Sequence, residues 1–252
     1  MKKSISAILA SYLVYLATGC VATPKPELVA ELDALAKTPA KKTMAPDLSS
    51  YTAQPIKAGQ WTHYLMVDKS GKSTSYRQQV LAQGDEPGSF WFETETITPG
   101  SKSVARSLAY VDDQVRLNNK TGKYTFTIDQ FVHIKRLINW HASEAKATEL
   151  PPQAVQLISG AIGKVSFLSN SRMNGVETAN VKAGSFKRCF RMTSQAQTSF
   201  FSSSVTGCVH PSVPLSSLVS AVDSEGTRWE LMGYGLDAKE SFIRVPIQTA
   251  GF

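Results

Sequence analysis

The chain has 252 residues, of which 42% are hydrophobic and 19% are charged, and its formal net charge is +7 at pH 7. This length is enough for one substantial domain with a tether, or for two small domains. The basic residues are scattered along the chain rather than gathered into a stripe, which argues against a nucleic-acid-binding protein.

The N-terminal segment has the layout of an export signal. Lys2 and Lys3 give it a positive start, and its apolar stretch is shorter than the ~20 residues that cross a bilayer. Residues 17–20 then read Ala-Thr-Gly-Cys, which resembles the lipobox of bacterial lipoproteins. In that family the cysteine thiol is diacylated, the chain is cut before it, and the new N-terminus is acylated. The resemblance implies a signal peptide over residues 1–19 and a lipid, palmitate among its acyl chains, on Cys20.

The residues on either side of this cysteine refine the expectation. Ala17 stands where the family prefers leucine. Val21 follows the cysteine where an aspartate would retain the protein in the inner membrane, so by resemblance to enterobacterial sorting the outer membrane is favoured. We therefore expect a membrane anchor in the outer membrane and a domain that faces the periplasm. The alternative is an ordinary cleaved signal in which Cys20 is incidental.

Residues 20–57 have the composition of a proline-rich tether, and residues 58–252 are expected to form a single β-rich domain. Pro26 suits the first position of a short helix, in which Leu28, Leu32 and Leu35 would share one stripe. A flexible leash with a transient helix and a helix docked on the domain both fit this pattern.

From Trp61 onward, short runs of aromatic and β-branched residues bounded by turn residues predict strands at hairpin spacing. The runs are residues 61–67, 76–82, 89–98, 104–111 and 124–128, then 165–168, 176–181, 213–222 and 227–234, with a turn expected at Asn174-Gly175. Two helices are expected between the two groups. One is capped by Asp129 and places Phe131, Ile134, Leu137, Ile138 and His141 on one face; the other begins at Pro151-Pro152.

This order favours an α+β fold, in which a curved antiparallel β-sheet, an open half-barrel, wraps against a small helical insertion. The runs Val181–Phe186, Val213–Leu215 and Glu230–Gly235, with Gly59–Trp61, resemble strands of uncharacterised envelope proteins. Those proteins are similar in layout to the lipoprotein carriers of the LolA/LolB type, an open barrel whose mouth is plugged by helices. The resemblance implies a LolA-like fold and does not fix an activity.

The remaining two cysteines form an even pair in a chain expected to reach an oxidising compartment. The sequence between Cys189 and Cys208 reads as a hairpin, in which the two would lie opposite each other within disulfide range. Closing this loop would add roughly 3 kcal/mol to stability in the chain-entropy model. We expect a structural disulfide rather than a metal site, because His210 has no ligand cluster beside it.

No catalytic motif stands out, and no cofactor is implied. His63, His133, His141 and His210 lack the spacing of a metal set. Glu93 and Glu95 alternate on one strand and would share a face, where they could serve as an acid and a base or simply be solvated. We therefore expect a protein that is not an enzyme.

The aromatic residues suggest where a ligand would bind if the sheet encloses a cavity. The candidates are Trp61, Trp91, Phe126, Phe131, Trp140 and Trp229, and the alternative is that they fill an ordinary core. Two functions follow as hypotheses. The first is an envelope binding or assembly module that contacts another envelope protein through its sheet edges. The second is a carrier or sensor of a lipid or other hydrophobic ligand.

Overall fold

The computed structural model describes residues 23–48, 54–118, 125–163, 168–197 and 202–250, and within these ranges the protein is mostly β. The helices are α2 (Pro26–Lys37) and α3 (Pro152–Gly163). The strands are β1 (Trp61–Val67), β2 (Ser73–Gln83), β3 (Ser89–Thr98), β4 (Ser101–Asn118), β5 (Thr125–His141), β6 (Ala147–Glu149), β7 (Leu168–Val181), β8 (Gly184–Gln197), β9 (Ser202–Val209), β10 (Leu218–Asp223), β11 (Arg228–Gly235) and β12 (Ile247–Thr249).

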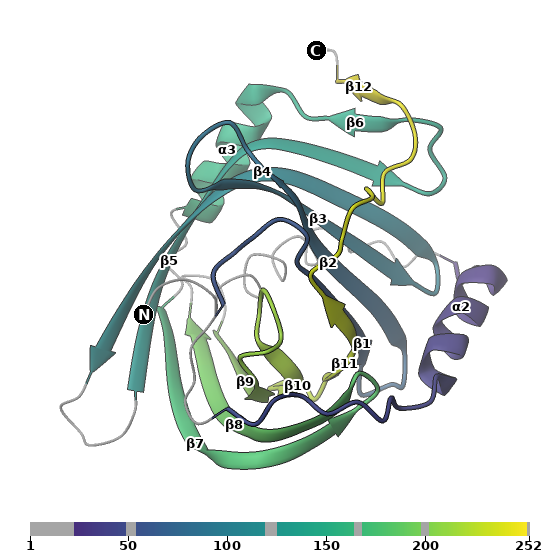
Figure 1. Ribbon diagram of the computed structural model, residues 1–252. Coiled ribbons are helices and arrows are strands. Elements are labelled where there is room, and N and C mark those ends of the chain that lie inside the picture. Colours follow the sequence, from purple (N-terminus) through teal and green to yellow (C-terminus); the bar gives the residue numbers. More distant parts are fainter. Residues whose placement is uncertain (1–22, 49–53, 119–124, 164–167, 198–201, 251–252) are drawn as a thin grey trace.

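All described strands belong to one sheet in the order β12-β6-β5-β4-β3-β2-β1-β11-β10-β9-β8-β7. The sheet curls strongly, so that β5 also pairs with β7 between Thr125–Ile128 and Ser169–Arg172 (Figure 1). The α+β, LolA/LolB-like expectation is therefore wrong: strands dominate, and α2 and α3 are the only helices in the described ranges.

The clearest local error concerns the helix expected after Asp129. Residues 125–141 instead form β5, which pairs with β4 from Asn118↔Thr125 to Ser103↔His141. Thr125, Thr127 and Val132 are β-branched, and such residues fit a pleated strand better than a helix. A long partner strand satisfies the backbone of the whole segment, and this pairing outweighs the apolar spacing that resembled a helix.

Other elements agree more closely with the sequence. The helices expected from Pro26 and from Pro151-Pro152 are confirmed as α2 and α3, and α3 contacts β5. The turn expected at Asn174-Gly175 is wrong, because both residues lie inside β7. The strand expected over 213–222 begins only at Leu218, after a loop in which Leu215 and Ser217 adopt positive φ.

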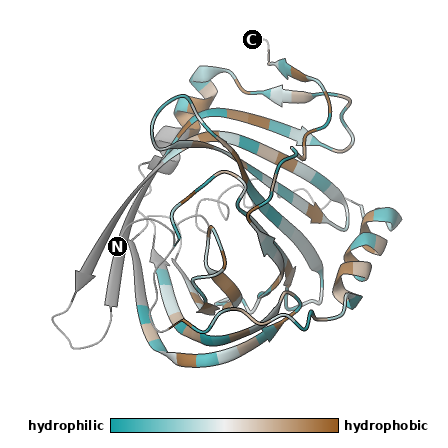
Figure 2. Ribbon diagram, viewed as in Figure 1, coloured by the Kyte–Doolittle hydropathy of each residue, from teal (hydrophilic) through white to brown (hydrophobic). Residues whose placement is uncertain are grey.

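The apolar residues form separate clusters within the described ranges, and hydrophobic and hydrophilic residues alternate along many strands (Figure 2). The largest cluster lies among β1, β2 and β7–β11, with Tyr64, Phe186 and Leu231 almost fully buried. A second cluster joins Val104 and Ile138 to Ile243, in the segment after β11. The C-terminal segment is therefore part of the packed domain.

The segment before β1 is docked on the sheet. The amide of Lys25 donates to the carbonyl of Pro99 at 2.7 Å, and Leu28 and Leu32 of α2 are buried against Ile97. After α2 the chain runs beside β8 (Figure 1), where Met44 forms a bridge with Ser185. Of the two alternatives for α2, the structure has the docked one. Neither described helix is long and apolar enough to cross a membrane.

Candidate functional site

A groove of about 800 Å³ lies across one face of β8, β9, β10, β11 and β1 and is the candidate functional site. Its lining residues combine aliphatic, aromatic, small polar and charged side chains. They are Leu65, Val67, Glu177, Ala179, Asn180, Val181, Arg191, Thr206, Gly207, Cys208, Ser220, Ala221, Val222, Arg228, Trp229 and Glu230.

The strand register explains why residues so far apart in sequence meet there. Directly opposed residues of neighbouring antiparallel strands point to the same face of a sheet. One such row across the floor of the groove runs Arg191, Cys208, Ser220, Glu230 and Leu65. The adjacent row on the same face runs Thr206, Val222, Arg228 and Val67. The floor is therefore a continuous track of side chains across the strands.

The hairpin of β7 and β8 supplies the wall. Its turn folds toward β11, because the amide of Ala183 donates to the carbonyl of Leu231 at 3.0 Å. β7 is the last strand of the sheet order, and its only described pairing besides β8 is the short one with β5. The edge of β7 from Met173 to Val181 is thus open within the described part of the chain, and Val176 on it is 51% exposed.

The charged side chains of the groove differ in whether they have a partner within the protein. Arg191 and Glu177 form an exposed ion pair at 3.7 Å. Glu230 accepts the amide of Lys182 at 3.0 Å, which ties the wall to the floor. The guanidinium of Arg228, just after the turn between β10 and β11, is exposed and makes no ion pair in the described ranges. Among the described residues that line the groove, Arg228 is therefore the cation available to an incoming group.

The two cysteines form a disulfide, as expected, with their Cα atoms 5.6 Å apart. The expected direct opposition is wrong. Cys208 is opposite Arg191 in the register, and Cys189 lies two residues before Arg191 on β8. Arg188, the residue before Cys189, has a φ of 56°. The register between β7 and β8 also shifts nearby, between Glu177 and Ala179. The strand pairing is therefore irregular where the disulfide forms. The bond fixes the floor of the groove, since Cys208 lines it.

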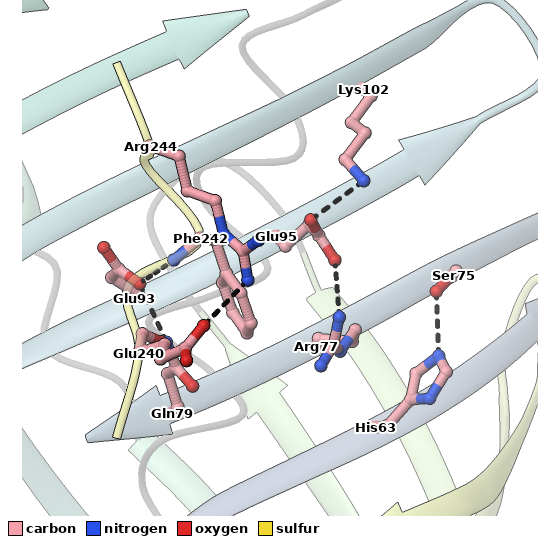
Figure 3. Close-up of polar contacts among 10 residues, drawn as sticks. All are labelled: His63, Ser75, Arg77, Gln79, Glu93, Glu95, Lys102, Glu240, Phe242 and Arg244. Atoms are coloured by element: carbon pink, nitrogen blue, oxygen red, sulfur yellow. Dashed lines mark hydrogen bonds and ion pairs between the residues drawn. The ribbon is translucent and has the colours of Figure 1, made fainter. Parts of the chain in front are cut away.

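The expectation that Glu93 and Glu95 share a face is confirmed, but neither is solvated: they are 0% and 4% exposed. Glu93 accepts from Arg106 Nε at 2.7 Å, from Gln79 Nε2 at 2.8 Å and from the amide of Phe242 at 2.8 Å. The C-terminal segment that carries Phe242 crosses over the strands at this point (Figure 3).

Glu95 is held beside this site by Arg77 and Lys102, each at 3.2 Å (Figure 3). The guanidinium of Arg77 also stacks 4.6 Å from the ring centroid of Phe242. Every strong contact of the two carboxylates joins strands to each other or to the C-terminal segment. The arrangement serves packing and cohesion of the sheet, and it leaves no open approach for an acid–base pair.

The four histidines are dispersed. His63 contacts Ser75 Oγ at 2.9 Å, and burial, with the nearby Arg77 guanidinium, lowers the pKa of His63 to about 4. His210 is fully buried beside Phe186, and this burial lowers its pKa. His133 and His141 both lie on β5. The described residues contain no group of three or more potential metal ligands.

The aromatic candidates do not line one cavity. Trp61 donates to Asp237 at 2.7 Å, and Trp91 and Trp140 pack in the cluster around Val104. Trp229 belongs to the main core and also reaches the groove. The side chains of Phe126 and Phe131, on β5, lie outside the described part. The sequence singled out Trp229 and Cys208, and it missed the other groove residues because only the register brings them together.

Comparisons with known proteins add little. No protein-family model and no curated protein matches the chain. A protein from Bacteroides fragilis described as exported, with a YmcC-like fold, aligns with 72% of this chain and 97% of its own, at 11% identity and a TM-score of 0.37. At that TM-score the likeness supports no conclusion about fold or function.

Proposed function

We propose that the chain is a lipid-anchored envelope lipoprotein whose folded domain is a non-enzymatic binding module, and that the groove beside β7 holds an extended segment of a partner envelope protein. The N-terminal sequence supports export and acylation at Cys20, and Val21 after it favours the outer membrane. The domain then faces the periplasm.

The observation that carries the binding role is the open edge of β7 next to the groove. A free strand edge offers a row of backbone donors and acceptors to an extended peptide, and pockets for alternate side chains give specificity. Here the edge spans Met173–Val181, and the groove beside it offers both aliphatic and charged contacts. Val222 and Arg228 line the same groove and are within the site that such a peptide would enter.

The lining favours a polypeptide over an acyl chain. Four ionisable side chains, Glu177, Arg191, Arg228 and Glu230, border the groove together with Thr206 and Ser220. Burying a hydrocarbon chain against them would remove charges from water without replacing their hydrogen bonds. A peptide backbone supplies those hydrogen bonds.

Site-specific photocrosslinking in cells tests the role. A photoreactive phenylalanine analogue replaces Val222, which is 45% exposed in the groove, or Leu157, which is 77% exposed on α3 and serves as the matched control. We expect a discrete protein adduct from position 222 and none from 157, and we expect Arg228→Glu to remove the adduct. An adduct that persists in the Arg228→Glu variant, or equal adducts at both positions, would contradict the groove as the binding site.

Anchoring has its own test. Wild-type protein should sediment with membranes and take up a labelled palmitate analogue, and Cys20→Ser should do neither. A Cys20→Ser variant that is fully processed and still membrane-bound would refute acylation at this residue.

A further inference from the structure

The docking of the segment before β1 sets how far the domain can stand from its lipid anchor. The first described contact with the sheet is the hydrogen bond from Lys25 to Pro99, only five residues after Cys20. Five extended residues reach at most about 17 Å. By contrast, an undocked segment over residues 20–57 would behave as a leash several times longer.

The docked segment is held at several points along its length. Leu28 and Leu32 are 8% and 2% exposed, and burial of these apolar side chains favours the docked state. Further on, the amide of Ala45 donates to Ser185 at 2.9 Å and the amide of Ser185 donates to Thr43 at 2.8 Å. The contacts therefore extend from one end of the segment to the other.

We propose that the end of the sheet that carries Lys25, the β3–β4 turn at Pro99 and the adjoining residue Ser143 lies against the lipid headgroups of the membrane in which Cys20 is inserted. We call this end the anchor end. Ser143 belongs to it because the amide of its neighbour Ala142 donates to Lys102, close to the same turn. The inference rests on the proposed acylation and adds an orientation to it.

The orientation also places the groove. Leu65 on its floor is opposite Ser75, and Ser75 is opposite Ile97, the residue that contacts α2. The groove and α2 therefore share one face of the sheet, with Leu65 about 10 Å from Ile97 across two strand spacings. A partner in the groove lies within roughly 30 Å of the bilayer, so a component of the same membrane is the class of partner that fits.

Energy transfer on the full-length lipidated protein tests the orientation. The protein is reconstituted into vesicles of equal parts phosphatidylethanolamine and phosphatidylglycerol that contain an acceptor-labelled lipid. A donor dye is placed through a non-natural residue at Ser143, on the anchor end, or at Asp85, in the turn between β2 and β3. The two positions lie at opposite ends of the strands, roughly 25 Å apart. We expect transfer from position 143 to exceed that from position 85, because the strands hold Asp85 away from the anchor end.

Two insertions of the same flexible Gly/Ser segment, about 20 residues long, sharpen the test. Placed between Ala22 and Thr23, the segment lengthens the link before the docked part, so the difference between the two dyes should disappear. Placed between Ser50 and Tyr51, it follows the contacts of Lys25, α2 and Ala45 along the chain, so it should leave the difference unchanged.

The orientation of the anchor end and the acylation of Cys20 can fail independently. Equal effects of the two insertions, or equal transfer from the two dyes in the parent protein, would overturn the anchor end while leaving acylation intact. A protein that carries no acyl mass on the peptide containing Cys20 and does not bind vesicles would instead refute the proposed anchoring.

Discussion

The carboxylate of Glu93 and the guanidinium of Arg106 form an ion pair at 2.7 Å between neighbouring strands, with Glu93 fully buried and the side chain of Arg106 18% exposed. The hydroxyl of Ser241 donates to the same carboxylate at 2.6 Å, so the C-terminal segment is fastened to the sheet through this pair. A buried carboxylate with this many donors is well compensated, but each partner depends on the others.

Glu93→Gln is expected to destabilise the protein by about 3 kcal/mol, because it leaves Arg106 without its counter-charge in a mostly buried site. Urea denaturation followed by fluorescence measures the change. Glu240→Gln is the matched control, since Glu240 pairs with Arg244 on the same segment but both are exposed. The control should leave stability unchanged within error. A loss at Glu93 no larger than that at Glu240 would show that the pair does not hold the segment.

Removal of the disulfide should weaken the hairpin that forms the groove floor. The double variant Cys189→Ala/Cys208→Ala is expected to lose about 2–4 kcal/mol of stability, mainly because the unfolded chain gains freedom. Thermal melts with and without reductant give the same comparison in the wild-type protein. The expectation fails if reductant leaves the melting temperature of the wild type unchanged while its two thiols become reactive.

His63 should make stability depend on pH. Its pKa of about 4 in the folded protein lies below the ordinary value of 6.5, so between these values the unfolded chain binds a proton that the folded chain does not. The contribution of His63 to the free energy of unfolding is therefore fully present above pH 6.5. This contribution falls as the pH drops toward 4 and does not change further below that pH. The total loss from this residue is of the order of 1–3 kcal/mol.

His63→Gln isolates this contribution, because glutamine keeps a hydrogen-bonding group toward Ser75 and does not titrate. The free energy of unfolding at pH 7 and pH 5 is compared in both proteins. The buried His210 acts with the same sign in both and cancels. Equal losses in the wild type and the variant would show that His63 does not carry the dependence.

The sequence could predict elements whose signals are local. Pro26 with Leu28 and Leu32 predicted α2, and aromatic and β-branched runs such as Trp61–Val67 predicted strands of the right type. The pair of cysteines that remains besides Cys20 predicted the disulfide. The secondary-structure prediction failed where pairing with a strand distant in sequence decides the conformation. The apolar residues of β5 also fit a helical spacing, and only the pairing with the long strand β4 identifies the segment as a strand.

The candidate site could not be predicted for a related reason. Arg191 and Cys208 are paired between β8 and β9, and the register of β10 and β11 continues their row to Leu65 on β1. No spacing along the chain encodes that row. Likewise, the sequence placed Glu93 and Glu95 on one strand face, for acid–base work or for solvation. The burial of Glu93 instead results from Ser241 and Phe242, which lie far along the chain.

Hydrogen–deuterium exchange tests the central claim, that the β7 edge and the groove receive a partner, most directly. The lipoprotein is exchanged in isolated cell envelopes and, separately, after purification in detergent. We predict that peptides covering Met173–Val181 and β10 exchange more slowly in envelopes, because a bound segment protects their amides, while peptides from α3 exchange equally in both. Identical exchange of β7 and β10 in the two preparations would contradict the claim.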